Sequence, residues 1–170
     1  FNTDIIIRSS AINEDNIKKS NAGYYDSYII KKDNFNKIED KIIKLIRKFK
    51  NAKDQILVQK FVQKPEIAGV IFTKDKTTNS HYYDINYDNS GKSNLITSGK
   101  YNPTIKSLTI FKNSKTIPSR FKNLIDISRK LEKKFNNDRL DIEFCIKNNK
   151  VHILQCRPLL GTRKLVNKSK

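Results

Sequence analysis

The chain has 170 residues, of which 36% are hydrophobic and 31% charged, with 5 Gly and 4 Pro. This composition excludes collagen-like, low-complexity and membrane-spanning chains and leaves a soluble globular domain that can bury a core. The 35 Lys and Arg against 17 Asp and Glu give a formal net charge of +18, which attracts polyanions. Because the positive residues are scattered along the chain and are mostly Lys, we interpret the charge as a compositional bias that disfavours nucleic acid as the main partner.

The beginning of the chain and its cysteines indicate a cellular compartment. The chain begins at Phe1 and contains no Met, so we expect an N-terminal part of the protein to be missing. The first apolar run is short and ends at Arg8, which is unlike a signal peptide. Cys145 and Cys156 lie in apolar runs, where we expect buried free thiols rather than a disulfide. These features predict a cytoplasmic protein.

The first two thirds of the chain predict short strands around one amphipathic helix. We expect strands over 4–8 and 25–30, separated by a polar loop, and then a helix over 36–49, where apolar residues recur at helical spacing. From residue 55 onward the pattern changes to β. The strands expected there cover residues 55–62, 67–73, 82–87, 94–97 and 107–112.

The last third predicts a second helix and a hairpin. Pro118 is expected to begin the helix, which carries a broad apolar face and ends at Asn136, a residue type that tolerates the left-handed conformation. Strands over 140–146 and 151–156 follow, and the basic residues after Pro158 form a tail. The fold class predicted is therefore α+β, with a largely antiparallel sheet and packed helices.

The terminal hairpin carries the residues best suited to chemistry. Successive strand residues alternate faces, so Asp141 and Glu143 share one face and the apolar residues between them share the other. Mg²⁺ takes one or two carboxylates together with substrate phosphates. In the second strand, Gln155 offers a carbonyl oxygen or an amide, and Arg157 offers a planar fork of donors for phosphate.

The turn decides whether these four side chains share a face. A two-residue Asn148-Asn149 turn would place Gln155 with the apolar residues and separate it from the two acids. A three-residue loop, with Asn149 in the left-handed position, would pair Ile146 with Lys150, place Asp141 opposite Gln155, and gather all four on one face. We expect the three-residue loop.

This choice of turn has a cost, and the four residues also have a structural interpretation. With the three-residue loop, Val151 and Ile153 would lie on the acidic side of the hairpin. The structural interpretation is a solvated edge hairpin with a surface salt bridge between an acid and Arg157.

Four segments, in order along the chain, resemble the nucleotide-binding domain of phosphoenolpyruvate synthases and pyruvate phosphate dikinases. Asp141 to Phe144 with Val151 to Leu159 is similar to that family's D-I-E-W … (I/L)-Q-A-R-P-L ending. The other segments are Ile7 to Ala11 with Glu14-Asp15 (V-R-S-S-A … E-D), Ser20 to Ser27 (S-F-A-G-Q-Y-x-S), and Leu57 to Val62 with Ala68 to Asp75 (V-Q-x-M-V … S-G-V-x-F-T-x-D).

The resemblance implies an ATP-grasp fold, in which two α+β lobes clamp ATP between sheets and Mg²⁺ bridges its phosphates. Residues 1–162 would form part of this domain, lacking a portion of the N-terminal lobe, and residues 163–170 a basic tail or linker. It implies phosphate contact and a catalytic role in stabilising transferred charge for Arg8 and Arg157. It further implies cofactor-binding roles for Gly23, Gln59, Phe61, Val62 and Gln155, and a metal site at Asp141, Glu143 and Gln155.

In this family a phosphoryl group passes from ATP to a histidine on another domain of the same protein, and then to pyruvate or another small acceptor. Neither His81 nor His152 has the setting of that histidine, and residues 89–99 lack the family's acidic residue. The sequence therefore predicts an incomplete ATP-dependent phosphotransferase with no membrane association. The alternatives are a kinase of a different acceptor such as the glutamine amide, a basic nucleic-acid-binding module, and a domain that has kept the fold without the chemistry.

Overall fold

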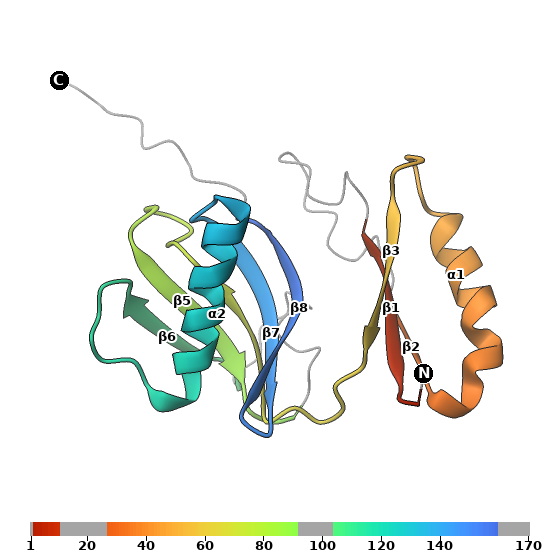
Figure 1. Cartoon of the computed structure of the whole chain (residues 1–170), viewed down its shortest axis with the longest axis horizontal. Helices are drawn as coiled ribbons and strands as arrows, with labels where there is room; N and C mark the ends of the chain where they lie inside the picture. Colours follow the sequence, from red (N-terminus) through yellow and green to blue (C-terminus); the bar gives the residue numbers. More distant parts are fainter. Residues whose placement is uncertain (1, 11–26, 92–103, 160–170) are drawn as a thin grey trace. The chain divides into compact units, whose positions relative to one another are not determined.

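The computed structural model describes residues 2–10, 27–91 and 104–159. Within these ranges the fold is α+β, with two antiparallel sheets and two α-helices (Figure 1), which confirms the expected fold class. The chain divides into two compact units, Phe1–Gln63 and Lys64–Lys170. Each unit has its own sheet, its own helix and its own apolar core.

The first unit is built on a sheet of order β2-β1-β3, here called the N-terminal sheet. Its strands are β1 (Ile5–Ser10), β2 (Ser27–Ile30) and β3 (Gln55–Lys60). A 3₁₀ segment, η1 (Lys32–Lys37), leads into helix α1 (Ile38–Ile46), which lies along one side of the sheet (Figure 1). Buried Ile5, Ile7 and Ile30 pack there against Leu45 of α1. Alternation along β1 therefore leaves Ile6 and Arg8 on the side opposite α1.

The second unit is built on a sheet of order β6-β5-β4-β7-β8, here called the C-terminal sheet. Its strands are β4 (Ile67–Phe72), β5 (Tyr82–Asp88), β6 (Lys106–Phe111), β7 (Leu140–Lys147) and β8 (Lys150–Pro158). Helix α2 (Ser119–Phe135) lies across one side of this sheet (Figure 1) and buries Phe121, Leu124 and Ile125 against it. The opposite side of the C-terminal sheet is called the distal face below.

The observed ends of the two helices differ in how closely they match the ends expected from the sequence. Pro118 precedes α2, and Asn136 ends it in the left-handed conformation with φ 47°, as expected from the sequence. Helix α1 is shorter than the expected range of 36–49, because the residues before Ile38 form the 3₁₀ segment and neither end carries a side-chain cap. The strand expected over 94–97, the residue Gly23 and the tail over 163–170 lie outside the described residues.

The hairpin between β7 and β8 corrects the expected turn. Asn148 and Asn149 both adopt left-handed φ values, of 50° and 57°, and form a two-residue turn that pairs Ile146 with Val151. Asparagine is among the few residue types that tolerate this conformation at both positions. The expectation of a three-residue loop was therefore wrong.

A β-bulge further along the hairpin nevertheless gathers the four candidate side chains. The register shifts between Glu143 and Phe144, so that Leu154 is the extra residue on β8. Beyond the bulge Glu143 lies opposite Gln155 and Asp141 lies opposite Arg157, on the distal face. The expected common face is thus confirmed, whereas the expected pairing of Asp141 with Gln155 was wrong.

The same bulge places the apolar residues of β8 on the side of α2. Val151 and Ile153 pack against the core cluster, together with Cys156. The expectation that Val151 and Ile153 would lie on the acidic side was therefore wrong. Between the turn and the bulge, the odd-numbered residues Val151 and Ile153 face the core. After the bulge the even-numbered residue Cys156 faces it instead.

The cysteines are free thiols, as expected. Cys145 is buried and lies opposite His152, whereas Cys156 is half-buried and lies opposite Ile142. The two thiols therefore point to different faces of the sheet. Among the described residues, no helix is both long and apolar enough to cross a membrane.

Candidate functional site

The distal face of β7 and β8 carries a charged pair near the beginning of β7 and the end of β8. Arg157 donates a hydrogen bond from Nε to the Oδ2 atom of Asp141 at 3.0 Å, and its Nη2 atom forms an ion pair with the same oxygen at 3.0 Å. The Asp141 side chain is only 12% exposed and that of Arg157 is 38% exposed. This is the ion pair that the structural interpretation of the hairpin predicts, although the carboxylate is far more buried than in a typical surface salt bridge.

Glu143 and Gln155 form the next pair along the same two strands. They lie directly opposite one another, and both side chains are partly buried. Two residues of strand separate this pair from Asp141 and Arg157, a distance of about 7 Å along the sheet. Within that short distance the distal face therefore presents two carboxylates, one amide and one guanidinium.

Thr73 fixes the beginning of β7, and with it the position of Asp141. The buried Thr73 hydroxyl accepts a hydrogen bond from the Leu140 backbone N–H at 2.8 Å and donates one to the Asp138 carbonyl at 2.9 Å. The Thr73 backbone N–H also donates to the Leu140 carbonyl at 2.9 Å. Two hydrogen bonds therefore hold Leu140, the residue before Asp141, and a third holds Asp138, which limits the freedom of the Asp141 carboxylate.

Two further cationic side chains lie where β7 begins. Lys74 is nearly buried and forms an ion pair with Asp138 at 2.7 Å, and its hydrogen bond holds the pKa of that carboxyl below the usual value. Arg139 has buried Nε and Nη2 atoms that meet no hydrogen-bond acceptor in the described part of the chain. Buried arginine donors without an acceptor are costly, which makes Arg139 a candidate for binding an anion. The sequence did not predict this residue.

Strand β5 adds polar groups to the distal face that were also missed. Asp84 accepts a hydrogen bond from the Thr109 hydroxyl at 2.8 Å, and Asn86 accepts one from the Ser107 hydroxyl at 2.6 Å. The sequence contained the signal, because polar residues alternate with the apolar ones that face α2 along this strand.

Asp88, at the end of β5, has a structural explanation. Its carboxylate is 1% exposed and accepts hydrogen bonds from the Ser90 backbone and hydroxyl and from the Thr104 hydroxyl. These contacts tie the ends of the segment between β5 and β6 to the sheet. We therefore leave Asp88 out of the candidate site.

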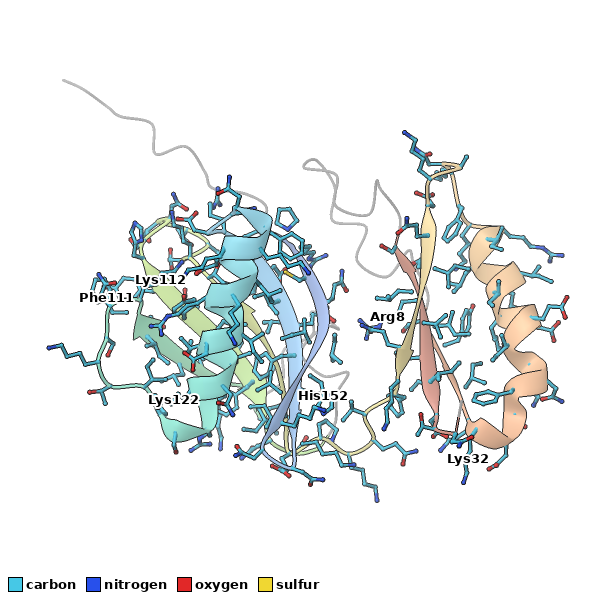
Figure 2. The ribbon with its side chains drawn as sticks, viewed as in Figure 1. Arg8, Lys32, Phe111, Lys112, Lys122 and His152 are labelled. Carbon is cyan, nitrogen blue, oxygen red and sulfur yellow. The ribbon has the colours of Figure 1, made fainter. Side chains whose placement is uncertain are left out.

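In the first unit, the candidate residues lie on the side of the N-terminal sheet opposite α1. Arg8 projects from β1 on this side (Figure 2), and the register places Gln59 of β3 on the same side. The Gln59 Oε1 atom is buried and accepts no hydrogen bond from a residue that the structure describes. Phe61 and Val62 follow β3 and are partly buried, directly before the boundary between the two units.

The donor set on β7 and β8 fits magnesium only together with a ligand that brings oxygens of its own. Among the described residues, no group of three or more His, Cys, Asp or Glu side chains could hold a metal ion. Asp141, Glu143 and Gln155 supply two carboxylates and one amide oxygen. Such a set suits Mg²⁺, which is usually held by one or two carboxylates plus phosphate oxygens and water.

The two thiols near this site are poorly suited to nucleophilic chemistry. Burial raises the pKa of Cys145 to about 11. Burial and the charge of Asp141 both raise the pKa of Cys156. Because the thiolate is the reactive form, neither cysteine is a candidate catalytic group.

Comparisons with known proteins add no assignment to this site. No protein-family model matches the chain, and no curated protein matches it.

Proposed function

We propose that the chain is the nucleotide-binding part of an ATP-dependent phosphotransferase of the phosphoenolpyruvate synthase type, with an ATP-grasp fold. In this proposal it binds Mg-ATP and passes a phosphoryl group, through a histidine on another domain, to pyruvate or another small acceptor. The proposal rests on the ordered sequence resemblance and on the side chains that the β7–β8 hairpin gathers.

One observation carries the proposal: Asp141, Glu143, Gln155 and Arg157 form two directly opposed pairs on one face of two rigid strands. A solvated edge hairpin needs no bulge to expose its polar residues. Here a bulge at Leu154 moves Gln155 and Arg157 to the face of the acids, and the Asp141 side chain that results is 12% exposed. Phosphoryl-transfer sites stabilise the transferred charge with preorganised, partly desolvated charges, and rigid strands can hold such charges in place.

The residues have distinct roles in this proposal. Asp141 and Glu143, with the oxygen of Gln155, would hold Mg²⁺, which neutralises phosphate charge when it is bound. Arg157 neutralises Asp141, which would otherwise repel the phosphates, and its planar fork suits phosphate oxygens. The N–H groups of Arg139 add positive charge at the beginning of the same strand.

The first unit supports the proposal through the placement of its own candidates. In each unit the helix covers one side of the sheet, and the candidate side chains lie on the other side. Arg8 would contact phosphate, and the buried Oε1 atom of Gln59 can accept a hydrogen bond from an amino group such as that of adenine. The backbone of Phe61 and Val62 would contact the base in the family manner.

The deciding experiment is calorimetric binding of ATP to the full chain, with and without Mg²⁺. We expect Mg²⁺-dependent binding that falls at least 10-fold in Glu143→Gln and in Arg157→Ala. Glu39→Gln is the matched control, because Glu39 is an exposed carboxylate on α1, outside the candidate site. Its affinity should equal that of the unmodified chain.

Two results would contradict the proposal. The first is absence of ATP binding by a chain whose circular dichroism shows it to be folded. The second is ATP binding that is unchanged in both Glu143→Gln and Arg157→Ala, which would reduce the hairpin to a structural salt bridge. If ATP binding and its loss in the two variants are observed, release of AMP by the complete protein in the presence of candidate acceptors would identify the acceptor.

A further inference from the structure

The outer face of α2 carries five exposed cationic side chains, here called the basic face. None of them forms an ion pair with a residue that the structure describes. They are Arg120, Lys122, Lys130, Lys133 and Lys134. Figure 2 labels Lys122 near the beginning of the helix. Their positions around the helix direct these residues away from the apolar face that packs on the sheet.

The acids of α2 do not compensate this charge. Asp126 pairs with Arg129 at 3.5 Å, and Glu132 binds Lys112 and accepts a hydrogen bond from the Tyr83 hydroxyl at 3.1 Å. The first turn of α2 contains no acidic residue. Within the part of the chain that the structure describes, the positive charge of the basic face is therefore uncompensated, and it is concentrated near the two ends of the helix.

The two sides of the second unit differ in their charges. The distal face of its sheet carries both signs, because Arg157, Lys147 and Lys150 lie there together with Asp84, Asp141 and Glu143, whereas the charges of α2 outside its two ion pairs are all positive. Helix α1 of the first unit shows no comparable excess, because Glu39 and Asp40 accompany Lys41 and Lys44. The composition of the chain alone therefore does not explain the basic face.

We propose that the basic face of α2 binds the phosphate backbone of a nucleic acid. From Arg120 to Lys134 the helix rises about 21 Å. With one charge per ~3.4 Å of each strand, that length faces about six phosphates of one strand. Exposed lysine ammonium groups are suited to such contacts, which position the nucleic acid without reading its sequence.

The residues of α2 favour a polynucleotide over a membrane or an acidic protein. A helix that lies on a membrane inserts an apolar face, and the apolar face of α2 is buried in the core through Phe121, Leu124 and Ile125. Protein interfaces are centred on buried aromatic or aliphatic anchors. The one large apolar side chain that α2 exposes among its described residues is Phe135, at its C-terminal end.

Fluorescence anisotropy with a labelled 20-base-pair duplex and a 20-nucleotide RNA tests the proposal on the full chain. We expect the logarithm of the affinity for the duplex to fall with the logarithm of salt concentration with a slope of about −4, from four to five phosphate contacts. The variant Lys122→Gln/Lys130→Gln/Lys134→Gln should reduce this slope by about 2.7. Its affinity in 100 mM salt should fall at least 10-fold.

The matched control is Lys37→Gln/Lys44→Gln/Lys53→Gln, which changes the net charge equally through exposed lysines of the first unit. We expect its affinity to stay within 3-fold of the unmodified chain. The single variant Lys122→Glu should also weaken binding, and it places a favourable acid in the first turn of α2, so misfolding would not explain a loss.

Three outcomes would overturn the proposal. Equal losses in the two triple variants would show that diffuse charge attracts the nucleic acid. Absence of binding to either nucleic acid in 50 mM salt would exclude the surface. Binding to phosphatidylserine vesicles without binding to nucleic acid would assign the basic face to a membrane. The proposal does not depend on the ATP site, so Glu143→Gln should leave nucleic-acid binding unchanged.

Discussion

Replacement of Gly69 by alanine tests the packing that sets the position of β7. Gly69 lies on β4, opposite Phe144, on the side of the sheet that α2 covers. A Cβ atom at this position would lie 2.5 Å from the Asn86 carbonyl oxygen and 2.9 Å from Cζ of Phe144. Gly69 does not have a positive φ, so the glycine is needed for space and not for backbone conformation.

The contact with Asn86 sets the magnitude. The new Cβ would stand about 0.9 Å inside ordinary contact with a backbone oxygen that belongs to a neighbouring strand. A side chain can rotate away from such a clash, but this carbonyl can move only with β5. We therefore expect Gly69→Ala to lower the free energy of unfolding by about 3 kcal/mol, at the upper end of the cost of overpacking.

Urea unfolding followed by circular dichroism measures this loss, since the chain contains no Trp for fluorescence. The double variant Gly69→Ala/Phe144→Leu separates the two contacts. Because Phe144→Leu has a cost of its own, the double variant is compared with Phe144→Leu alone. On that background Gly69→Ala should cost about 1 kcal/mol less than in the unmodified chain, and the remaining cost is due to the carbonyl. A loss below 1 kcal/mol in Gly69→Ala would refute the steric argument.

Three further predictions concern buried or titrating groups. Lys112→Met should lower the free energy of unfolding by about 3 kcal/mol, because it leaves the nearly buried Glu132 without its cation, and Lys112→Met/Glu132→Gln should recover part of that loss in urea unfolding. Because burial raises the pKa of Cys145 to about 11, iodoacetamide at pH 8 should modify this thiol only after unfolding, as peptide mass analysis would show. The Lys32 backbone N–H and the Gln63 amide lower the pKa of Asp4, so Asp4→Asn should lower stability most at pH 7. This loss should shrink as the pH falls below 3.8 and through the folded pKa, as a series of urea titrations at decreasing pH would show.

The elements that the sequence predicted well are those with strong local signals. Helix α2 has a clear apolar period, a proline before it and an asparagine after it, and its ends agree with the expectation within a residue. Helix α1 has the period but no proline before it and no left-handed residue at its end, and its ends were expected two to three residues too far out. Boundaries follow caps more closely than they follow periodicity.

The basic face of α2 is a feature that the sequence pattern did not predict. Its cations are spread over residues 120–134 and look like the rest of a lysine-rich chain. They become a surface only because the helix turns them outward and because Lys112 and Arg129 occupy the two acids. The pair between Glu132 of α2 and Lys112, the residue after β6, is a tertiary feature that the sequence pattern does not show.

The bulge at Leu154 could have been inferred from the sequence, although we did not infer it. Val151 and Ile153 are apolar and belong in the core, whereas Gln155 and Arg157 are polar and belong outside it. All four have odd numbers, so an uninterrupted strand would place them on the same face. Either two polar side chains would be buried under α2 or two apolar ones would be exposed, and each choice is costly.

A single inserted residue between Ile153 and Gln155 removes this conflict, and the structure places the extra residue there. The two-residue turn and the bulge therefore act together. The turn directs Val151 and Ile153 of β8 into the core, and the bulge directs Gln155 and Arg157 to the distal face. Three-residue loops also bring Gln155 to the face of the acids, but only by exposing Val151 and Ile153. A test of both halves of the strand, rather than of the four polar residues alone, would have favoured the observed hairpin.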